Sequence, residues 1–129
     1  MTFYHSQILK LHSELYSKEY LIQQVIHAKQ YIDSNFAEKI NLDTLAVKAC
    51  LSKFHFIRCF KILYGTTPHQ YLITVRVRHA KQLLQNNKSI ADTCVATGFE
   101  SVTSFIGLFK KIAGCTPDLY RRKKQFSRV

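Results

Sequence analysis

The chain has 129 residues, of which 47% are hydrophobic and 21% are charged, and its 19 Lys and Arg residues against 8 Asp and Glu residues give a formal net charge of +11. This composition fits one compact domain, or at most two very small ones with a linker, and excludes collagen-like, low-complexity and wholly disordered chains. We expect a cytoplasmic protein, because we find neither a signal peptide nor an apolar run long enough to span a bilayer.

Helical periodicity dominates the chain, and strand signals are nearly absent. A first helix over about 19–36 is predicted by apolar residues at three- and four-residue steps, namely Ile22, Val25, Ile26, Ile32 and Phe36. Asn41 is expected to cap a short helix over 42–49. Ser52 is expected to cap a helix that runs to about residue 64 and stops at Gly65.

The remaining helices carry similar signals, with a serine or a Thr-Pro pair where a helix begins. They are predicted from Thr67-Pro68 to about residue 85, from Ser89 to Gly98, from Ser101 to Gly114, and from Thr116-Pro117 onward. Proline suits the first position of a helix, and Ser89 with Asp92 has the spacing of a capping box. The sequence therefore predicts an all-α fold of about seven helices without a sheet.

One segment of the chain is repeated. LDTLAVKACL at 42–51 aligns with IADTCVATGF at 90–99, and SKFHFIRCFKILYGTTPHQY at 52–71 aligns with SVTSFIGLFKKIAGCTPDLY at 101–120, with Glu100 as the single insertion. Both copies keep a Phe-Lys pair, then a glycine, a Thr-Pro pair and a tyrosine. Because a helical solenoid needs about three repeats or more, we interpret the two copies as a duplicated functional motif.

Each copy consists of a short helix, a turn and a longer helix, which is the helix-turn-helix arrangement that places its second helix in the major groove of DNA. Expected core-facing residues of these second helices are Phe56, Phe60 and Leu63 in the first copy and Phe105, Phe109 and Ile112 in the second. Helical geometry puts on the outward faces Phe54, Ile57, Arg58 and Lys61 in the first copy and Thr103, Ile106, Gly107 and Lys110 in the second. These outward faces are candidate DNA-reading surfaces.

The distribution of charge supports this interpretation. Residues 1–43 contain 4 basic and 5 acidic side chains, whereas residues 44–129 contain 15 basic and 3 acidic ones. Such an excess favours a polyanionic partner, with nucleic acid ahead of an anionic membrane surface. A generic basic surface that keeps the protein soluble is the alternative.

The two copies and the basic helix between them resemble the DNA-binding region of AraC/XylS-type transcription regulators, and of MarA-like members in particular. The motifs that carry this resemblance are Ser52-Lys53-Phe54-His55, Arg58, Phe60-Lys61, Ser89-Ile90-Ala91-Asp92 and Gly98-Phe99-Glu100-Ser101. It covers about residues 20–123. It implies two helix-turn-helix subdomains joined by a long linker helix, so that recognition helices over about 52–64 and 101–113 enter successive major-groove segments on one face of DNA.

On this interpretation the chain divides into five parts. They are an N-terminal helical extension (1–19), a first helix-turn-helix subdomain (20–66), a linker helix (67–85), a second helix-turn-helix subdomain (86–123) and a basic tail (124–129). We expect the extension to be dispensable for DNA contact, because it has no excess of basic side chains. The expected partners are double-stranded DNA and RNA polymerase, with a homodimer as a further option and no membrane.

Base contacts and phosphate contacts are expected from different residues. Candidates for base contact are Lys53, Phe54, Ile57, Arg58, Val102, Thr103, Ile106 and Gly107. Candidates for phosphate contact are Asn41, Ser52, Lys61, Ser89, Ser101, Lys110, Lys111 and Arg121. The resemblance implies that Arg58 is a base-contacting arginine, whose guanidinium fork suits the O6/N7 edge of guanine. Hydrogen-bonded readout should therefore reside mainly in the first copy, since Val102, Ile106 and Gly107 have no side-chain donor.

Some of these residues have a second interpretation. Phe54 either contacts a thymine methyl or covers the edge of the core, and Gly107 either permits close approach to DNA or has drifted on a solvent-exposed face. The basic run at 121–124 is either a phosphate clamp or a disordered terminus. The linker-helix cations are expected to form a solvated face with occasional phosphate contact, and they are Arg76, Arg78 and Lys81.

The cysteines and histidines do not predict a cofactor. The four cysteines are Cys50, Cys59, Cys94 and Cys115, and their spacing matches no zinc motif, so we interpret them as small buried side chains in a reducing compartment. His55 lies four residues before Cys59, but two ligands are too few for a metal site. We therefore expect neither a metal nor any other cofactor, and the absence of a catalytic motif argues against an enzyme.

A protein-interaction or dimerisation module, with incidental and non-specific binding of nucleic acid, is the alternative function. It rests on apolar residues with a spacing similar to that of a coiled coil, interrupted by lysines, namely Tyr4, Ile8, Leu11, Leu15, Ile22, Val25, Ile32 and Phe36. This seam would bind a second copy of the chain through residues 1–36, or a sensor domain that this chain lacks. Binding to DNA would then be weak and lost at moderate salt.

Overall fold

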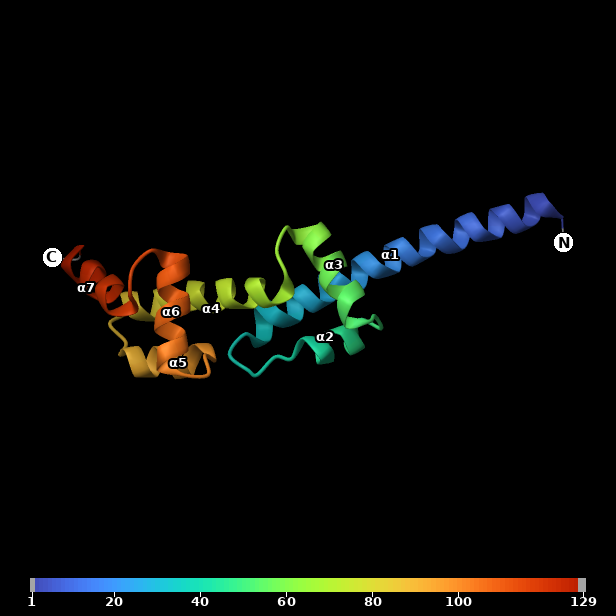
Figure 1. Cartoon of the computed structure of the whole chain (residues 1–129). Coiled ribbons are helices and arrows are strands. Elements are labelled where there is room, and N and C mark those ends of the chain that lie inside the picture. The colour runs from blue at the N-terminus through green and yellow to red at the C-terminus, as the bar shows by residue number, and fades with distance from the viewer. Residues whose placement is uncertain (1, 128–129) are drawn as a thin grey trace. The chain divides into compact units, whose positions relative to one another are not determined.

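The computed structural model describes the backbone of residues 2–127 and the side chains of this range except 11–17 and 126–127. Within this range it contains seven α-helices and no strand (Figure 1), which confirms the predicted all-α fold. The helices are α1 (Phe3–Asn35), α2 (Leu42–Lys48), α3 (Lys53–Tyr64), α4 (Pro68–Gln85), α5 (Ile90–Thr97), α6 (Val102–Ala113) and α7 (Pro117–Ser127). None of these described helices has the length and apolar character needed to cross a bilayer.

Helix α1 is longer than the sequence predicts. It begins at Phe3 rather than near residue 19 and has 33 residues, so the expected limit of the N-terminal extension falls inside a continuous helix. The predicted helix left out residues 3–18, although Tyr4, Ile8, Leu11 and Leu15 follow helical steps there, and extending an existing helix adds one hydrogen bond for each residue that is fixed. The N-terminal half of α1 extends beyond α2 and α3 (Figure 1), and its described side chains over 2–10 and 18–20 are exposed.

The predicted residues at the helix ends are confirmed. Each predicted N-cap has an extended backbone and a side-chain oxygen that accepts a hydrogen bond from an N–H group two or three residues later. These N-caps are Asn41, Ser52, Ser89 and Ser101. Left-handed glycines end three helices, namely Gly65, Gly98 and Gly114. The caps supply partners to backbone groups that have none within the helix.

The helices form two compact units. Unit 1 consists of Met1–Tyr31 and Asn41–Pro68, which include most of α1 together with α2 and α3. Unit 2 consists of Ile32–Ile40 and His69–Val129, which include the end of α1, almost all of α4, and α5 to α7. The predicted linker helix, α4, thus belongs to the same compact unit as the second helix-turn-helix.

The core of unit 1 lies between α1, α2 and α3. Its buried apolar residues are Val25, Ala28, Leu45, Ala46, Ala49, Phe56 and Phe60. The ring centres of Phe56 and Phe60 are 5.9 Å apart, and those of Phe60 and Tyr64 are 4.9 Å apart. Helix α3 therefore packs through residues spaced by four, and Leu63, which was predicted to face the core, is 41% exposed.

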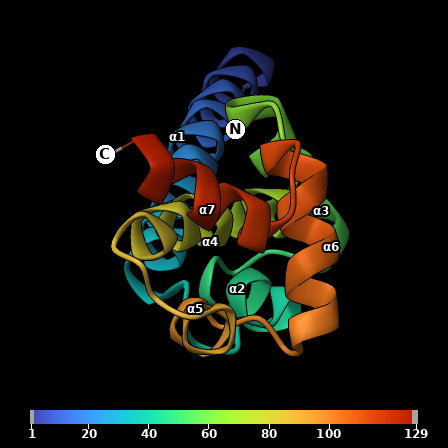
Figure 2. The same cartoon turned by 90° about the vertical axis from the view of Figure 1, so that its left-hand side faces the viewer.

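In unit 2, helices α5, α6 and α7 surround the C-terminal half of α4 (Figure 2). The buried cluster consists of Ile73, Val77, Ala80, Leu84, Cys94, Phe99, Phe105 and Phe109. Ala113 of α6 packs against this cluster, whereas Ile112, predicted to face the core, is 42% exposed. The predictions for Leu63 and Ile112 are wrong for the same reason: along a buried i, i+4, i+8 row each step turns about 40° around the helix, so residue i+7 lies at the edge of the buried face and not at its centre.

Arg76 is not part of a solvated face, and that prediction is wrong. Its side chain is 7% exposed, and its guanidinium donates hydrogen bonds to the carbonyl of Phe36 at 2.7 Å and of Glu38 at 2.9 Å. Burial lowers the pKa of Arg76, while the charge of Glu100 acts in the opposite direction. The turn after α1 leaves carbonyl groups that need donors, and Arg76 supplies them, whereas Arg78 is exposed as predicted and Lys81 is half-buried.

The sequence predicts four buried cysteines, but the structure buries only some of them. Cys94 is buried, which raises the pKa of its thiol, and Cys59 and Cys115 are half-buried. Cys50 is exposed, so for this residue the prediction is wrong. It has a φ of +57° and lies in the turn between α2 and α3, and a left-handed residue that ends a helix lies at the surface more readily than in a core.

The basic run at 121–124 is helical, because α7 continues to Ser127. Arg121 and Arg122 pair with the carboxylate of Asp118 in the first turn of this helix, at 3.4 Å and 3.1 Å. These pairs at i, i+3 and i, i+4 stabilise the helix modestly. The alternative of a disordered terminus at 121–124 is therefore excluded, and the expected tail starts inside α7.

Candidate nucleic-acid interface

The outward face of α3 exposes the predicted base-contact residues of unit 1. Phe54 is 81% exposed, so it does not cover the edge of the core. Lys53, Arg58 and Lys61 are exposed as well, and Ile57 is half-buried. Lys53 lies 3.8 Å from the carboxylate of Asp43, but both side chains are about half exposed or more, so water screens this pair. The face thus combines long cationic side chains with an accessible aromatic ring.

The outward face of α6 has a different chemistry. Val102 is 43% and Ile106 37% exposed, and Thr103 and Gly107 are exposed between them. Lys110 and Lys111 follow on the last turns of the helix and are also exposed. The first turns of this surface therefore carry short, mostly apolar side chains. Its positive charge is concentrated at the C-terminal end of α6.

The predicted phosphate contacts at the helix N-termini are the N-cap residues. Asn41, Ser52 and Ser101 are exposed and Ser89 is half-buried. Their side-chain oxygens accept hydrogen bonds from N–H groups of the helix. Each serine hydroxyl still has one hydrogen, and the Asn41 amide has two, that can be donated to another acceptor. The N-terminus of a helix also carries partial positive charge that favours an anion. Capping and phosphate contact are therefore compatible.

Arg121 differs from the other phosphate candidates because it already has an ionic partner. Its guanidinium lies 3.4 Å from Asp118, and its side chain is 29% exposed, against 75% for Arg122. A phosphate contact by Arg121 would have to weaken this pair. Arg122 and the two exposed lysines of α6 are more accessible cations in this unit.

Tyr71 and Tyr120, for which the sequence predicts no role, anchor α4 within unit 2. The hydroxyl of Tyr71 donates to the carboxylate of Asp33 at the end of α1. Tyr120 accepts a hydrogen bond from the side-chain amide of Gln85 at 2.8 Å, and its ring packs against Phe109. The only signal in the sequence is that the repeat keeps a tyrosine at this position in both copies.

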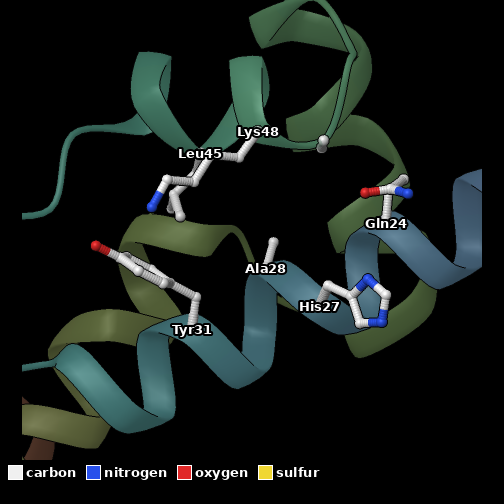
Figure 3. Close-up of a pocket in the computed structure, with 7 residues that line it drawn as sticks. Gln24, His27, Ala28, Tyr31, Leu45 and Lys48 are labelled. Atoms are coloured by element: carbon white, nitrogen blue, oxygen red, sulfur yellow. The ribbon is translucent and has the colours of Figure 1, made fainter.

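A small pocket lies elsewhere in unit 1, between α1 and α2, with a volume of about 210 Å³. Figure 3 shows its lining side chains, with Gln24, His27, Ala28 and Tyr31 from α1 and Leu45 and Lys48 from α2. The Nζ atom of Lys48 lies 3.8 Å from the centre of the Tyr31 ring, a cation–π contact. All buried side-chain N and O atoms in the described part of the chain have hydrogen-bond partners.

The structure adds no metal site to the interface. Among the described residues, no three His, Cys, Asp or Glu side chains gather in a way that could hold a metal ion. His55 and Cys59 therefore have no third ligand in this part of the chain. The candidate site consists of the exposed faces of α3 and α6, the N-caps and the lysines beside them.

Known proteins share both the sequence and the fold of these units. A family model described as a helix-turn-helix domain matches residues 45–123. The bifunctional transcriptional activator/DNA repair enzyme AdaA of Bacillus subtilis is 43% identical over 94 residues, which are 72% of this chain and 44% of AdaA. The MmsAB operon regulatory protein of Pseudomonas aeruginosa is 33% identical over 99 residues, which are 76% of this chain and 32% of that protein. The chain thus spans less than half the length of either relative.

The structural comparison agrees. The DNA-binding domain of AdpA, a global transcriptional factor crystallised with a target DNA, has a TM-score of 0.72 and 32% identity, over 84% of this chain and 95% of that domain. An AraC-type regulator from Chromobacterium violaceum has a TM-score of 0.70 and 29% identity, over 79% of this chain and 92% of the other. With its duplicated helix-turn-helix and these matches, the chain belongs to the AraC-type family of helix-turn-helix DNA-binding transcription regulators.

Proposed function

We propose that this chain regulates transcription by binding double-stranded DNA sequence-specifically, with α3 and α6 inserted into successive major-groove segments. The observation that carries the proposal is the duplicated motif, in which α3 and α6 each bury one pair of phenylalanines and expose the opposite face. A buried row fixes each helix in its unit, while the other face remains free for base edges. The solved complex of AdpA with a target DNA supports DNA as the partner of such a domain.

Charge supports the same partner. Residues 44–129, which contain all of the repeat except its first two residues, have 15 basic and 3 acidic side chains. Lysines and arginines that neutralise phosphates release counterions, which strengthens binding at low salt. The base contacts are assigned to Lys53, Phe54, Ile57, Arg58, Val102, Thr103, Ile106 and Gly107. The phosphate contacts are assigned to the four N-caps, Lys61, Lys110, Lys111 and Arg121, of which Arg121 is paired with Asp118.

Selection of bound sequences from a random duplex pool tests this proposal most directly. We expect an enriched motif with two parts whose centres are about 10 base pairs apart, because accessible major-groove faces recur once per helical turn. Footprinting of the selected DNA should then show two protected segments. Protection of one short segment, or binding without any enriched sequence, would contradict the proposal.

A role in binding rather than in catalysis is part of the proposal. The repair activity in the name of AdaA belongs to a protein of which this chain covers 44%, and the family model that matches residues 45–123 is described as a helix-turn-helix domain. We propose RNA polymerase as a second partner, because a regulator bound beside a promoter acts by changing how the polymerase binds or starts there. The cytoplasm is the proposed location, because a protein that binds promoters in a bacterium has to reach the chromosome.

Helix α1 provides the proposed surface for a homodimer. Three residues of the predicted seam are exposed, namely Tyr4 (75%), Ile8 (46%) and Ile22 (46%). Val25 and Ile32 are buried in the core and are not available to a partner. The side chains of Leu11 and Leu15 lie outside the described residues. Sedimentation equilibrium of the full chain and of Ile8→Asp tests the dimer, which the charge should dissociate. A wild-type chain that stays monomeric at high concentration would contradict it.

A further inference from the structure

Gly107 lies in the middle of α6, where glycine weakens the helix relative to alanine. The backbone there is ordinary helix, since the left-handed glycines of the chain are Gly65, Gly98 and Gly114. A Cβ atom built on Gly107 would meet no other atom within 4 Å. Neither backbone conformation nor packing inside the protein therefore requires glycine at this position.

The exposed apolar side chains near Gly107 are Val102 and Ile106, whereas its neighbours three and four residues along the helix are polar or charged, namely Thr103, Ser104, Lys110 and Lys111. Thr103 is four residues before it, Ile106 lies beside it, and both are exposed, as is Val102 at the start of the helix. The corresponding position in α3 is Arg58, a long side chain with five N–H donors. The two helix surfaces therefore differ in height at this position. In α3 a long cationic side chain protrudes, whereas α6 has no side chain there.

We infer that α6 reads thymine methyl groups at short range and that the missing side chain at Gly107 lets the helix lie closer to the base edges. This inference rests on the proposed function and assigns the DNA chemistry that the second recognition helix accepts. The thymine C5-methyl is the apolar group that the major groove displays, and apolar side chains are its natural contacts. Lys110 and Lys111, exposed on the same helix, supply positive charge for the phosphates that flank such a site.

Replacing thymine with uracil tests the inference, because uracil keeps the base-pairing groups and O4 and lacks only the methyl. The full-length chain is titrated with its selected operator, in which one thymine at a time is changed to deoxyuridine. We expect an affinity loss of about fourfold for each methyl in contact, confined to one half of the operator. Equal affinity for thymine and uracil at every position would overturn the inference.

Two isoleucines of α6 provide a matched pair of variants. Ile106 is 37% exposed beside Gly107, and Ile112 is 42% exposed on another face of the same helix. Ile106→Ala should remove most of the preference for thymine over uracil, whereas Ile112→Ala should retain it. If both variants behave alike, α6 does not present the face assigned to it.

Gly107→Ala separates the stability of the helix from its contact with DNA. The substitution should raise the midpoint of thermal unfolding by about 3–6 °C, because alanine is the better helix former. It should also lower operator affinity by about tenfold, since the added methyl occupies the space needed for close approach. This loss should shrink on DNA in which the facing thymine is replaced by uracil. Unchanged or higher affinity would overturn the role of Gly107.

The outcomes distinguish this inference from the function on which it rests. If the wild-type chain enriches no sequence, the proposed function itself fails. If it enriches an operator that is insensitive to uracil and to Gly107→Ala, sequence-specific DNA binding stands and only the assignment of α6 as a methyl reader is wrong.

Discussion

The two copies of the helix-turn-helix share one framework and differ at the turn and at the reading face. In each copy a capping serine begins the second helix, two phenylalanines four residues apart enter the core, and a left-handed glycine ends the helix. At the turn, the first copy has Cys50 with a φ of +57°, and the second has Gly98 with a φ of +83°. The motif thus demands a left-handed residue there but does not by itself demand glycine.

Contacts outside the motif explain why the second copy has glycine. A Cβ atom at Gly98 would lie 2.6 Å from the carbonyl oxygen of Ala37, in the turn after α1. Cys50 is exposed, so its Cβ and thiol have room. The two copies therefore share the left-handed backbone conformation at this turn. The space around the turn determines whether the residue there can have a side chain.

The largest predicted effect comes from filling the space at Gly98. Gly98→Ala should destabilise unit 2 by about 2–5 kcal/mol, because left-handed strain adds to a clash with backbone atoms that cannot rotate away. Gly114→Ala is the matched control, with a φ of +85° and no atom within 4 Å of the added Cβ. It should cost only the strain, about 1–2 kcal/mol. Urea unfolding of both variants measures the difference, and equal losses would show that the approach of Ala37 is unimportant.

A second prediction concerns the buried arginine that unit 2 uses to hold the same turn. Arg76→Met should destabilise the protein by about 2–4 kcal/mol, because the carbonyl groups of Phe36 and Glu38 lose charged donors in a buried place. The control is Arg78→Met on the exposed side of α4. It should change stability by about 0.5 kcal/mol or less. Similar effects of the two substitutions on the denaturation midpoint would refute the role of Arg76.

The reading faces differ as well, and the third prediction compares their cations. Arg58→Ala should weaken operator binding by about 1–3 kcal/mol and relax the preference at one base pair, as expected when a bidentate contact is lost. Lys110→Ala should weaken all sequences alike and lower the salt dependence by about one counterion. Binding of both variants to single-base operator variants at two salt concentrations checks this. If Arg58→Ala scales all affinities equally and Lys110→Ala alters the preferred sequence, the roles are reversed.

The smallest predicted effect is a gain in stability in the first copy. Cys50→Gly should stabilise unit 1 by about 0.5–1 kcal/mol, because glycine relieves the left-handed strain and its larger freedom in the unfolded chain offsets only part of this gain. Cys50→Ala, which keeps a Cβ, is the control and should give no such gain. Calorimetry of both variants and of the wild-type chain measures the midpoint of thermal unfolding. A midpoint for Cys50→Gly below that of the wild-type chain would show that the thiol itself stabilises the fold.

Local sequence signals were enough to predict the repeat and the capped ends of α2, α3, α5 and α6, whereas the start of α1 at Phe3 was not predicted. Capping serines, glycines and Thr-Pro pairs act on backbone groups a few residues away, so Ser89 and Gly98 could be assigned to the ends of α5 without knowledge of the fold. The outward faces of α3 and α6 also follow from helical geometry alone, and their predicted residues are exposed, except for the half-buried Ile57.

The roles of the core-facing residues and of the cations depend on contacts that form only in the folded protein. Leu63 and Ile112 turned out to be exposed because the packing direction of a helix depends on its neighbours. Arg76 and Tyr71 have partners 38 to 40 positions earlier in the chain, at Asp33, Phe36 and Glu38. Local patterns contain no information about such distant groups. The need for glycine at position 98 depends in the same way on the backbone of Ala37, which reaches that turn only in the folded protein.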